Sequence, residues 1–208
     1  IVANKKLYVS KEDGFMGLSL KDSEFVSKCS EIDNVIVFLS NGNYLITKVE
    51  DKKYVGESII HVGLWKKNDI HMVYNLVYKD LTNKISYVKR FSVTKIVKDK
   101  IYQISKNKSK VLYLTANPNS ESEVVDIYLH HTSKSKRKNF IYDFSILSIK
   151  SRQAKGNIVS KHNIRKIDRK SIANFIFTLK LPQKDRDLLL ALTPKTYTGL
   201  AKKIVDLV

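Results

Sequence analysis

The chain has 208 residues, of which 43% are hydrophobic and 28% are charged, so it can bury a core in one ordinary domain or two small ones. This composition excludes a wholly disordered chain and a collagen-like one. No stretch reaches the roughly 18 uncharged apolar residues that a membrane-spanning helix needs, and we expect no membrane partner. The single cysteine, Cys29, cannot form an internal disulfide, which favours a reducing, cytoplasmic setting.

The formal net charge of +18 is the strongest signal in the composition, and such an excess is typical of proteins that bind nucleic acid or another anionic surface. A bias of 32 lysines against six arginines is also what an AT-rich genome produces. Residues 131–170, however, carry 12 Lys or Arg against only Asp143 and Asp168. More than half of the net charge therefore lies in a fifth of the chain, which codon bias alone does not explain.

Up to about residue 170, short β-rich runs alternate with turn residues. Residues 35–39 and 44–49 flank Asn41-Gly42, which is one of the strongest local signals for a β-hairpin. Four further hairpins are expected, with turns near residues 13, 82, 118 and 155. Five hairpins of this kind, each too small to be stable alone, predict radial or sandwich-like all-β packing.

The pattern changes from about residue 171. Helical spacing relates Ile172, Phe175, Ile176 and Leu179, and Thr193-Pro194 is typical of a helix start. The net charge of residues 171–208 is only +3. Composition and periodicity together predict a mostly β domain over residues 1–170 and a short α-helical C-terminal tail over residues 171–208.

The constellations that enzymes need are scarce in this sequence. There is no phosphate-cradling glycine loop and no pair of carboxylates, since acidic residues are scattered singly. The adjacent His130 and His131 are expected on opposite sides of a strand, where they poorly suit one metal ion. Cys29 has no nearby histidine and is expected to be a small buried hydrophobe. We therefore predict no catalytic residue, no metal site and no cofactor in this chain.

Basic residues interleaved with aromatic ones give a better functional signal. Lys89 and Arg90 lie between Tyr87 and Phe91, at an expected strand end. Positive charges on protruding turns can neutralise phosphates whatever the base sequence, whereas the aromatic rings are expected mainly in the core. The alternative is a solvated basic surface without a partner. The candidate DNA-binding residues are Lys89, Arg90, Lys134, Lys136, Arg137, Lys138, Lys150, Arg152, Lys155, Lys161, Arg165 and Lys166.

Several stretches in unbroken order resemble one family. They include Gly14-Phe15-Met16-Gly17 and residues 87–94, 111–119, 150–153, 156–158 and 162–167. Together they resemble the C-terminal domain of the A subunit of bacterial topoisomerase IV, a gyrase A-like domain, of the kind found in Bacteroidetes-type bacteria. The resemblance covers about three quarters of the chain.

This resemblance implies a β-pinwheel, a disc of propeller-like hairpin blades whose basic rim binds and bends duplex DNA in the nucleoid. It also implies two partners, which are the breakage-reunion core that precedes this domain in the family and the ATP-hydrolysing B subunit of topoisomerase IV. The active tyrosine, ATP and Mg²⁺ of that family belong to other domains or subunits. The glycine-rich stretch expected after Ile167 is absent, which predicts an incomplete pinwheel.

The tail resembles a different family. Residues 175–182 and 191–194, with Arg186 and Leu189, are similar to the extreme C-terminus of adenylosuccinate lyase, an enzyme of purine biosynthesis. One alternative is therefore a lyase-derived polypeptide, although neither the fumarase-superfamily signature nor long core helices are visible. The other alternative is a propeller-like protein-interaction module whose charge is incidental.

Overall fold

The computed structural model describes residues 4–169 and 182–185. Contacts divide the chain into two units, residues 1–168 and 169–208, and the first unit holds the elements discussed below. The predicted boundary near residue 170 and the predicted tail helices fall mostly on residues 170–181 and 186–208, which lie outside the described residues. Both stay predictions. Among the residues that are described, no helix has the length and apolar character of a membrane span.

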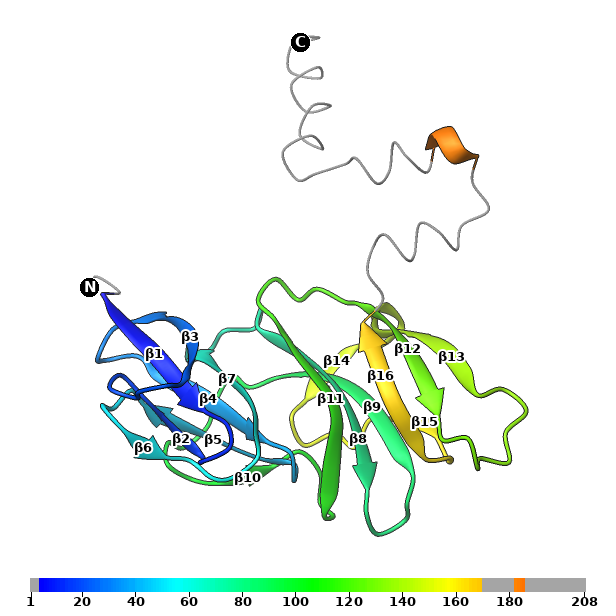
Figure 1. Cartoon of the computed structure of the whole chain (residues 1–208), viewed down its shortest axis with the longest axis horizontal. Helices are drawn as coiled ribbons and strands as arrows, with labels where there is room; N and C mark the ends of the chain where they lie inside the picture. The colour runs from blue at the N-terminus through cyan, green and yellow to red at the C-terminus, as the bar shows by residue number, and fades with distance from the viewer. Residues whose placement is uncertain (1–3, 170–181, 186–208) are drawn as a thin grey trace. The chain divides into compact units, whose positions relative to one another are not determined.

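Four antiparallel-rich sheets make up the first unit (Figure 1). Sheet A is ordered β3 (Glu24–Cys29), β1 (Lys5–Ser10), β2 (Phe15–Gly17), β6 (Lys53–Tyr54). Sheet B is ordered β10 (Tyr102–Gln103), β5 (Asn43–Lys48), β4 (Asn34–Leu39), β7 (Ile59–Trp65). Sheet C is ordered β11 (Ser109–Asn117), β8 (Val73–Asp80), β9 (Ser86–Ser92), β14 (Ile149–Ser151), and β15 (Asn157–Ser160) also pairs with β9. Sheet D is ordered β13 (Asn139–Asp143), β12 (Val124–Leu129), β16 (Ile164–Arg169), with the short 3-10 helix η1 (Phe144–Ile146) after β13.

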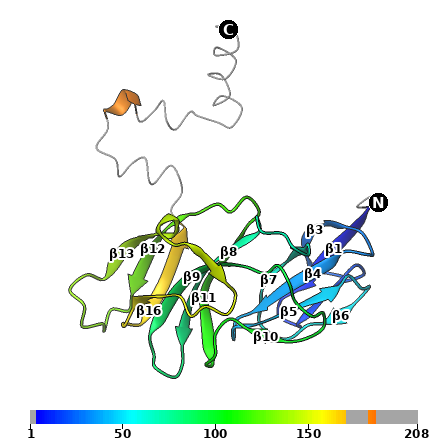
Figure 2. The same cartoon turned by 180° about the vertical axis from the view of Figure 1, so that it is seen from behind.

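The four sheets pack against one another in a row, so the inner strands of sheets B and C are buried on both faces. In β4, Val35 and Val37 join the core shared with sheet A, whereas Ile36 and Phe38 join the core shared with sheet C. In β8, Tyr78 faces sheet B, while the neighbouring Val77 packs with residues of sheet D. Since side chains alternate along a strand, one strand serves two cores. The order is therefore A, B, C, D, as the views from the front and from behind show (Figures 1 and 2).

Three of the five predicted hairpins are confirmed. They are β1–β2, β4–β5 and β8–β9, each an antiparallel pair of strands consecutive in sequence. In the second hairpin, Gly42 has φ +83°, and a Cβ there would lie 2.3 Å from the Ser109 hydroxyl oxygen. Positive φ and this close approach both require glycine, as the Asn-Gly signal predicts.

The fourth and fifth predicted hairpins are wrong. Strand β11 pairs along its whole length with β8, while β12 pairs with β13 and β16, so residues 118–123 connect two sheets. Strands β14 and β15 do not pair with each other, because both lie along the same edge of β9, one parallel and one antiparallel to it. The turn at residues 152–156 therefore crosses the middle of β9 rather than closing a hairpin.

Candidate nucleic-acid interface

Two of the predicted DNA-binding residues, Lys89 and Arg90, are buried. Their side chains are 1% and 7% exposed, because β9 continues through them to Ser92 and sheet C is covered on both faces. The expectation that they stand at a strand end, ready for phosphate, is therefore corrected. Both cations hold other parts of the protein in place.

The Lys89 ammonium lies among backbone carbonyls on the sheet B side of β9. Its Nζ donates to the carbonyl oxygens of Ile104 at 2.5 Å, Arg152 at 2.9 Å and Ala154 at 3.0 Å. The same atom lies 4.8 Å from the centre of the Phe91 ring. Burial lowers the pKa of Lys89 to about 8. Lys89 therefore joins β9 to the loop after β10 and to the 152–156 turn.

Arg90 likewise binds carbonyl oxygens, on the opposite face of β9. Its Nε donates to Asn75 Oδ1 at 3.0 Å, and its Nη2 donates to the carbonyl oxygens of Ser120 at 2.6 Å and Glu121 at 3.0 Å. Its Nη1 reaches the carbonyl oxygen of Leu147 at 3.5 Å. Residues 117–123 carry no basic side chain, so Arg90 anchors a segment without positive charge.

The 152–156 turn carries two predicted residues, Arg152 and Lys155. The half-buried Arg152 guanidinium lies 4.7 Å from the centre of the Tyr102 ring, and its Nη1 donates to the Tyr44 hydroxyl at 3.3 Å. These contacts fix the guanidinium plane at the protein surface. Lys155 is exposed, with its Nζ 4.6 Å from the centre of the Tyr87 ring, and a side-chain hydrogen bond with Tyr87 raises its pKa.

Backbone contacts hold the same turn against sheet C. The Tyr78 hydroxyl donates to the carbonyl oxygen of Lys155 at 2.6 Å. Gly156 has φ +88°, and a Cβ there would lie 2.4 Å from the carbonyl oxygen of Val88. Glycine is therefore required for the chain to pass this close to β9.

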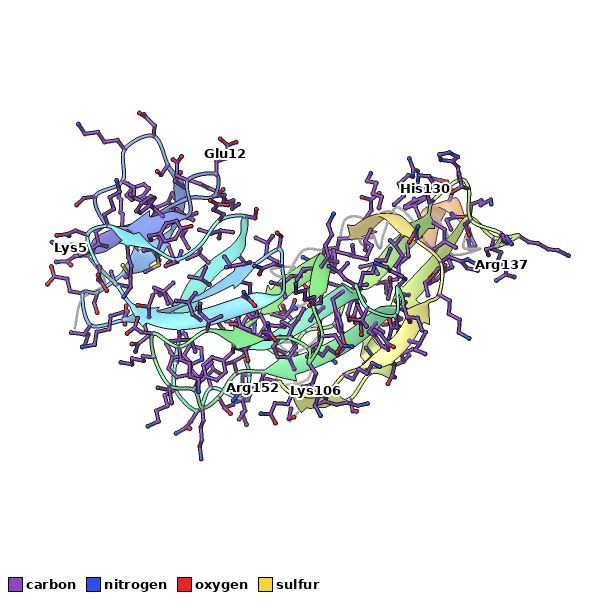
Figure 3. All side chains as sticks on the ribbon, turned by 90° about the horizontal axis from the view of Figure 1, so that it is seen from below. Lys5, Glu12, Lys106, His130, Arg137 and Arg152 are labelled. Carbon is purple, nitrogen blue, oxygen red and sulfur yellow. The ribbon has the colours of Figure 1, made fainter. Side chains whose placement is uncertain are left out.

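A cavity of about 400 Å³ lies between this turn and the loop after β10. Its lining includes Lys106 and Asn107 from the loop, Gln153 and Lys155 from the turn, and Asp80 from β8. Figure 3 shows Lys106 beside Arg152 on the same edge. Lys106 was not among the predicted residues, although the alternating lysines of residues 106–110 were a visible signal. Lys108 of the same run is also exposed.

The second group of predicted residues gathers around the loop between β12 and β13. Lys134, Lys136 and Arg137 are exposed, and Figure 3 shows Arg137 projecting from this loop. Lys138 Nζ donates to the carbonyl oxygens of His131 at 3.2 Å and Ser133 at 2.5 Å, which closes the loop on itself.

Neighbouring strands add charge to this loop. One cavity brings Lys138 and His131 together with Arg165 of β16, and another brings Arg137 together with Lys161. Lys166 is exposed and forms an ion pair with Asp168 at 2.8 Å. Lys150 is exposed on β14, with its Nζ 3.4 Å from Asn157 Oδ1.

His130 and His131 do not point to opposite sides of a strand. Strand β12 ends at Leu129, and the two rings lie side by side, tilted by 35°, with their centres 4.2 Å apart. Within the described part of the chain, no group of three or more His, Cys, Asp or Glu is placed to hold a metal ion. Cys29 is fully buried, as predicted.

Two basic groups result, and we name them by position. The turn cluster comprises Lys106, Lys108, Arg152 and Lys155, and the loop cluster comprises Lys134, Lys136, Arg137, Lys138, Lys161 and Arg165. Strand β15 connects them, since Gly156 precedes it and Lys161 follows it. At a rise of about 3.3 Å per residue, these ends are about 17 Å apart.

Charge is unevenly divided between the sheets. Residues 1–57 carry eight Lys against nine Asp or Glu, whereas residues 58–169 carry 23 Lys or Arg against eight Asp or Glu. The outer face of sheet A instead exposes Phe25 and Tyr54, at 51% and 55%. The excess of positive charge therefore lies after residue 57, in sheets C and D, in β7 and β10 of sheet B and in the turns between them.

Comparison with known proteins agrees with this architecture. Residues 6–171 match the topoisomerase C-terminal domain of Bacteroidota. The A subunit of DNA topoisomerase 4 from Borreliella burgdorferi is 28% identical over 165 residues, which are 79% of this chain and 25% of that protein. The chain thus spans a quarter of the length of that relative.

A solved structure shares the fold. The crystal structure of the C-terminal domain of DNA topoisomerase IV superposes with a TM-score of 0.55 at 13% identity, covering 80% of this chain and 61% of that one. At this identity the likeness concerns the fold alone. With the family match over residues 6–171, we conclude that the chain belongs to the family of Bacteroidota topoisomerase C-terminal domains.

Proposed function

We propose that this chain binds duplex DNA through the turn cluster and the loop cluster, and that it bends the duplex as an incomplete β-pinwheel. It would support ATP-dependent strand passage by a topoisomerase IV-type enzyme without catalysing it. Its partners would be the B subunit of that enzyme and the breakage-reunion core of the A subunit, and ATP and Mg²⁺ would act in those parts.

The observation that carries this proposal is the placement of charge. The residues of the two clusters project from turns and strand ends of sheets C and D, while sheet A and its connections are nearly neutral. Lys and Arg on such turns release counterions when they neutralise phosphates. The separation of about 17 Å along β15 is close to half a helical turn of B-DNA, which repeats every 34–36 Å. After half a turn the opposite strand faces the same side of the duplex, so the two clusters would contact the backbones of the two strands of one duplex.

The test is a salt titration of binding. Fluorescence anisotropy with labelled random duplexes of about 30 base pairs should show affinity falling by about 10²–10³-fold between 50 and 200 mM salt, if about five phosphates are neutralised. Duplexes of different sequence should bind alike. Binding that does not change with salt, or that requires one sequence, would contradict the proposal.

Bending is measured separately. Energy transfer between dyes on the two duplex ends should rise on binding, because a bend brings the ends together. If the chain binds without changing the distance between the duplex ends, the proposed phosphate interface stands and the proposed bending is wrong.

A further inference from the structure

Lys89 lies at the base of the turn cluster although it reaches no solvent. Its ammonium contacts carbonyls from both segments that carry the cluster, Ile104 on one side and Arg152 and Ala154 on the other. Ile104 stands two residues before Lys106, and the other two carbonyls belong to the turn itself. One buried cation thus holds together two loops that are about 50 residues apart in sequence.

The carbonyl oxygens need this cation. Three carbonyl oxygens that converge in a partly buried place repel one another, and each destabilises the fold if it is left without a donor. An ammonium has three N–H donors, and Lys89 directs them at three carbonyls. Without it, residues 152 and 154 would lose the donor that holds their carbonyl oxygens against β9.

Two further contacts fix the remainder of the turn. The Tyr78 hydroxyl binds the carbonyl oxygen of Lys155, and Gly156 passes close to the carbonyl oxygen of Val88. The side chains of Arg152 and Lys155 therefore project from a backbone that is fixed at residues 152, 154, 155 and 156. Groups held in place before binding lose less conformational entropy when they bind.

We propose that Lys89 is a positioning residue for DNA binding: it presents Arg152, Lys155 and Lys106 to the phosphates without touching DNA itself. This rests on the proposed function of the two clusters. On this proposal, the buried Lys89 has a larger effect on the affinity for duplex DNA than most exposed lysines have.

The test compares Lys89→Met with Arg90→Met. Both variants remove one buried positive charge from adjacent positions of β9, so any effect of net charge is the same. Arg90 binds Asn75 and the carbonyl oxygens of residues 120, 121 and 147, and none of these residues is basic. Duplex affinity should fall about tenfold more in Lys89→Met than in Arg90→Met, with urea unfolding confirming that both are folded under the binding conditions.

The salt dependence gives a readout that a merely structural role would not move. Each lost phosphate contact lowers the slope of log affinity against log salt by about one. We expect Lys89→Met to lower the slope by about two, because the contacts of Arg152 and Lys155 are lost together although both side chains remain. Hydrogen exchange at the amides of residues 152–156 should accelerate in the same variant.

Tyr78→Phe provides a milder variant should Lys89→Met fail to fold. It removes only the hydroxyl that binds the Lys155 carbonyl, and it should weaken duplex binding about twofold to threefold at unchanged net charge. Equal affinity and slope in wild type, Lys89→Met and Tyr78→Phe, all folded, would overturn this inference while leaving the proposed function intact. Failure of the wild type itself to bind duplex would instead overturn the proposed function, and the positioning role with it.

Discussion

At the scale of single residues, this protein uses buried polar side chains to hold loops in place. Lys89 and Arg90 serve opposite faces of one strand, and each satisfies carbonyl oxygens that the loops bring inside. Trp65 acts similarly, since its Nε1 donates to the carbonyl oxygen of Val93 at 2.6 Å and connects sheet B to the end of β9. A complete contact of this kind changes the free energy of unfolding little. Removing one partner leaves a buried polar group unsatisfied and lowers the free energy of unfolding much more.

His61 gives a pH-dependent prediction. It packs between Phe38 and Tyr74, with ring centres 6.1 Å from each, and burial, aided by Lys11, lowers its pKa to about 4. Between pH 6.5 and 4 the unfolded chain binds a proton at this residue and the folded chain does not. The free energy of unfolding should therefore be unchanged above pH 6.5 and should fall by about 3 kcal/mol on acidification to pH 4.

Urea unfolding of wild type and His61→Gln at pH 7 and pH 4.5 measures this effect. Glutamine does not titrate, so the variant should lose less stability on acidification than wild type does. The same loss in both proteins would show that other groups account for it.

Arg152 gives a second prediction at this scale. Its guanidinium stacks on Tyr102 and bonds to Tyr44, a geometry that a lysine ammonium cannot reproduce. Arg152→Lys keeps the charge, yet duplex affinity should fall about threefold to tenfold by anisotropy. Lys155→Arg, a charge-conserving change in the same turn, should have little effect. If the two variants bind alike, charge alone matters at this turn.

At the scale of elements, the sequence predicts local pairings and misses distant ones. The hairpin β4–β5 was predictable because Asn41-Gly42 fixes its turn within four residues. The partner of β11 was not, because β8 lies about 30 residues upstream and competes with the nearer β12. The parallel pairing of β14 with β9 has no local signal either.

The same limit explains the errors at the candidate site. Exposed lysines of residues 134–138 were recognisable from their density in a turn-like segment. The burial of Lys89 was not, because its carbonyl partners come from residues 104, 152 and 154, which only the sheet order brings together. Sequence patterns therefore predict which turns are basic, but not which cations those turns require beneath them.

Charge reversal in the loop cluster tests the role of its main element. Replacing Lys134, Lys136, Arg137 and Lys138 with Glu should lower duplex affinity at least tenfold more than replacing four exposed lysines of the near-neutral part, Lys6, Lys21, Lys28 and Lys48. Both variants change the net charge equally. The exposed charges of Lys134, Lys136 and Arg137 contribute little to stability, and Lys138 binds carbonyl oxygens of its own loop, so the circular dichroism of the sheets should match wild type. Equal losses would mean that net charge matters and that the loop does not.

At the scale of the whole described unit, charge is distributed unevenly along a row of packed sheets. Each sheet shares a core with the next, so the four sheets form one close-packed body. Sheet A contributes stability and exposed aromatic rings, and the charge that suits phosphate lies on the turns and strand ends of sheets C and D. On the proposed function, sheet A would stabilise the fold, whereas sheets C and D would bind the DNA.

The last prediction concerns catalysis by the chain alone. A tyrosine that attacks a phosphodiester must be accessible and must lose its proton, but Tyr44, Tyr74 and Tyr78 are fully or almost fully buried, and burial raises the pKa of each. The exposed Tyr54 lies beside Phe15 on the near-neutral sheet A, away from both basic clusters. We therefore expect purified chain, with ATP and Mg²⁺, neither to nick nor to relax supercoiled plasmid at concentrations that shift the plasmid in a gel. Reproducible relaxation that disappears in Tyr54→Phe would contradict this, because it would place a nucleophile on the sheet that carries no excess of positive charge.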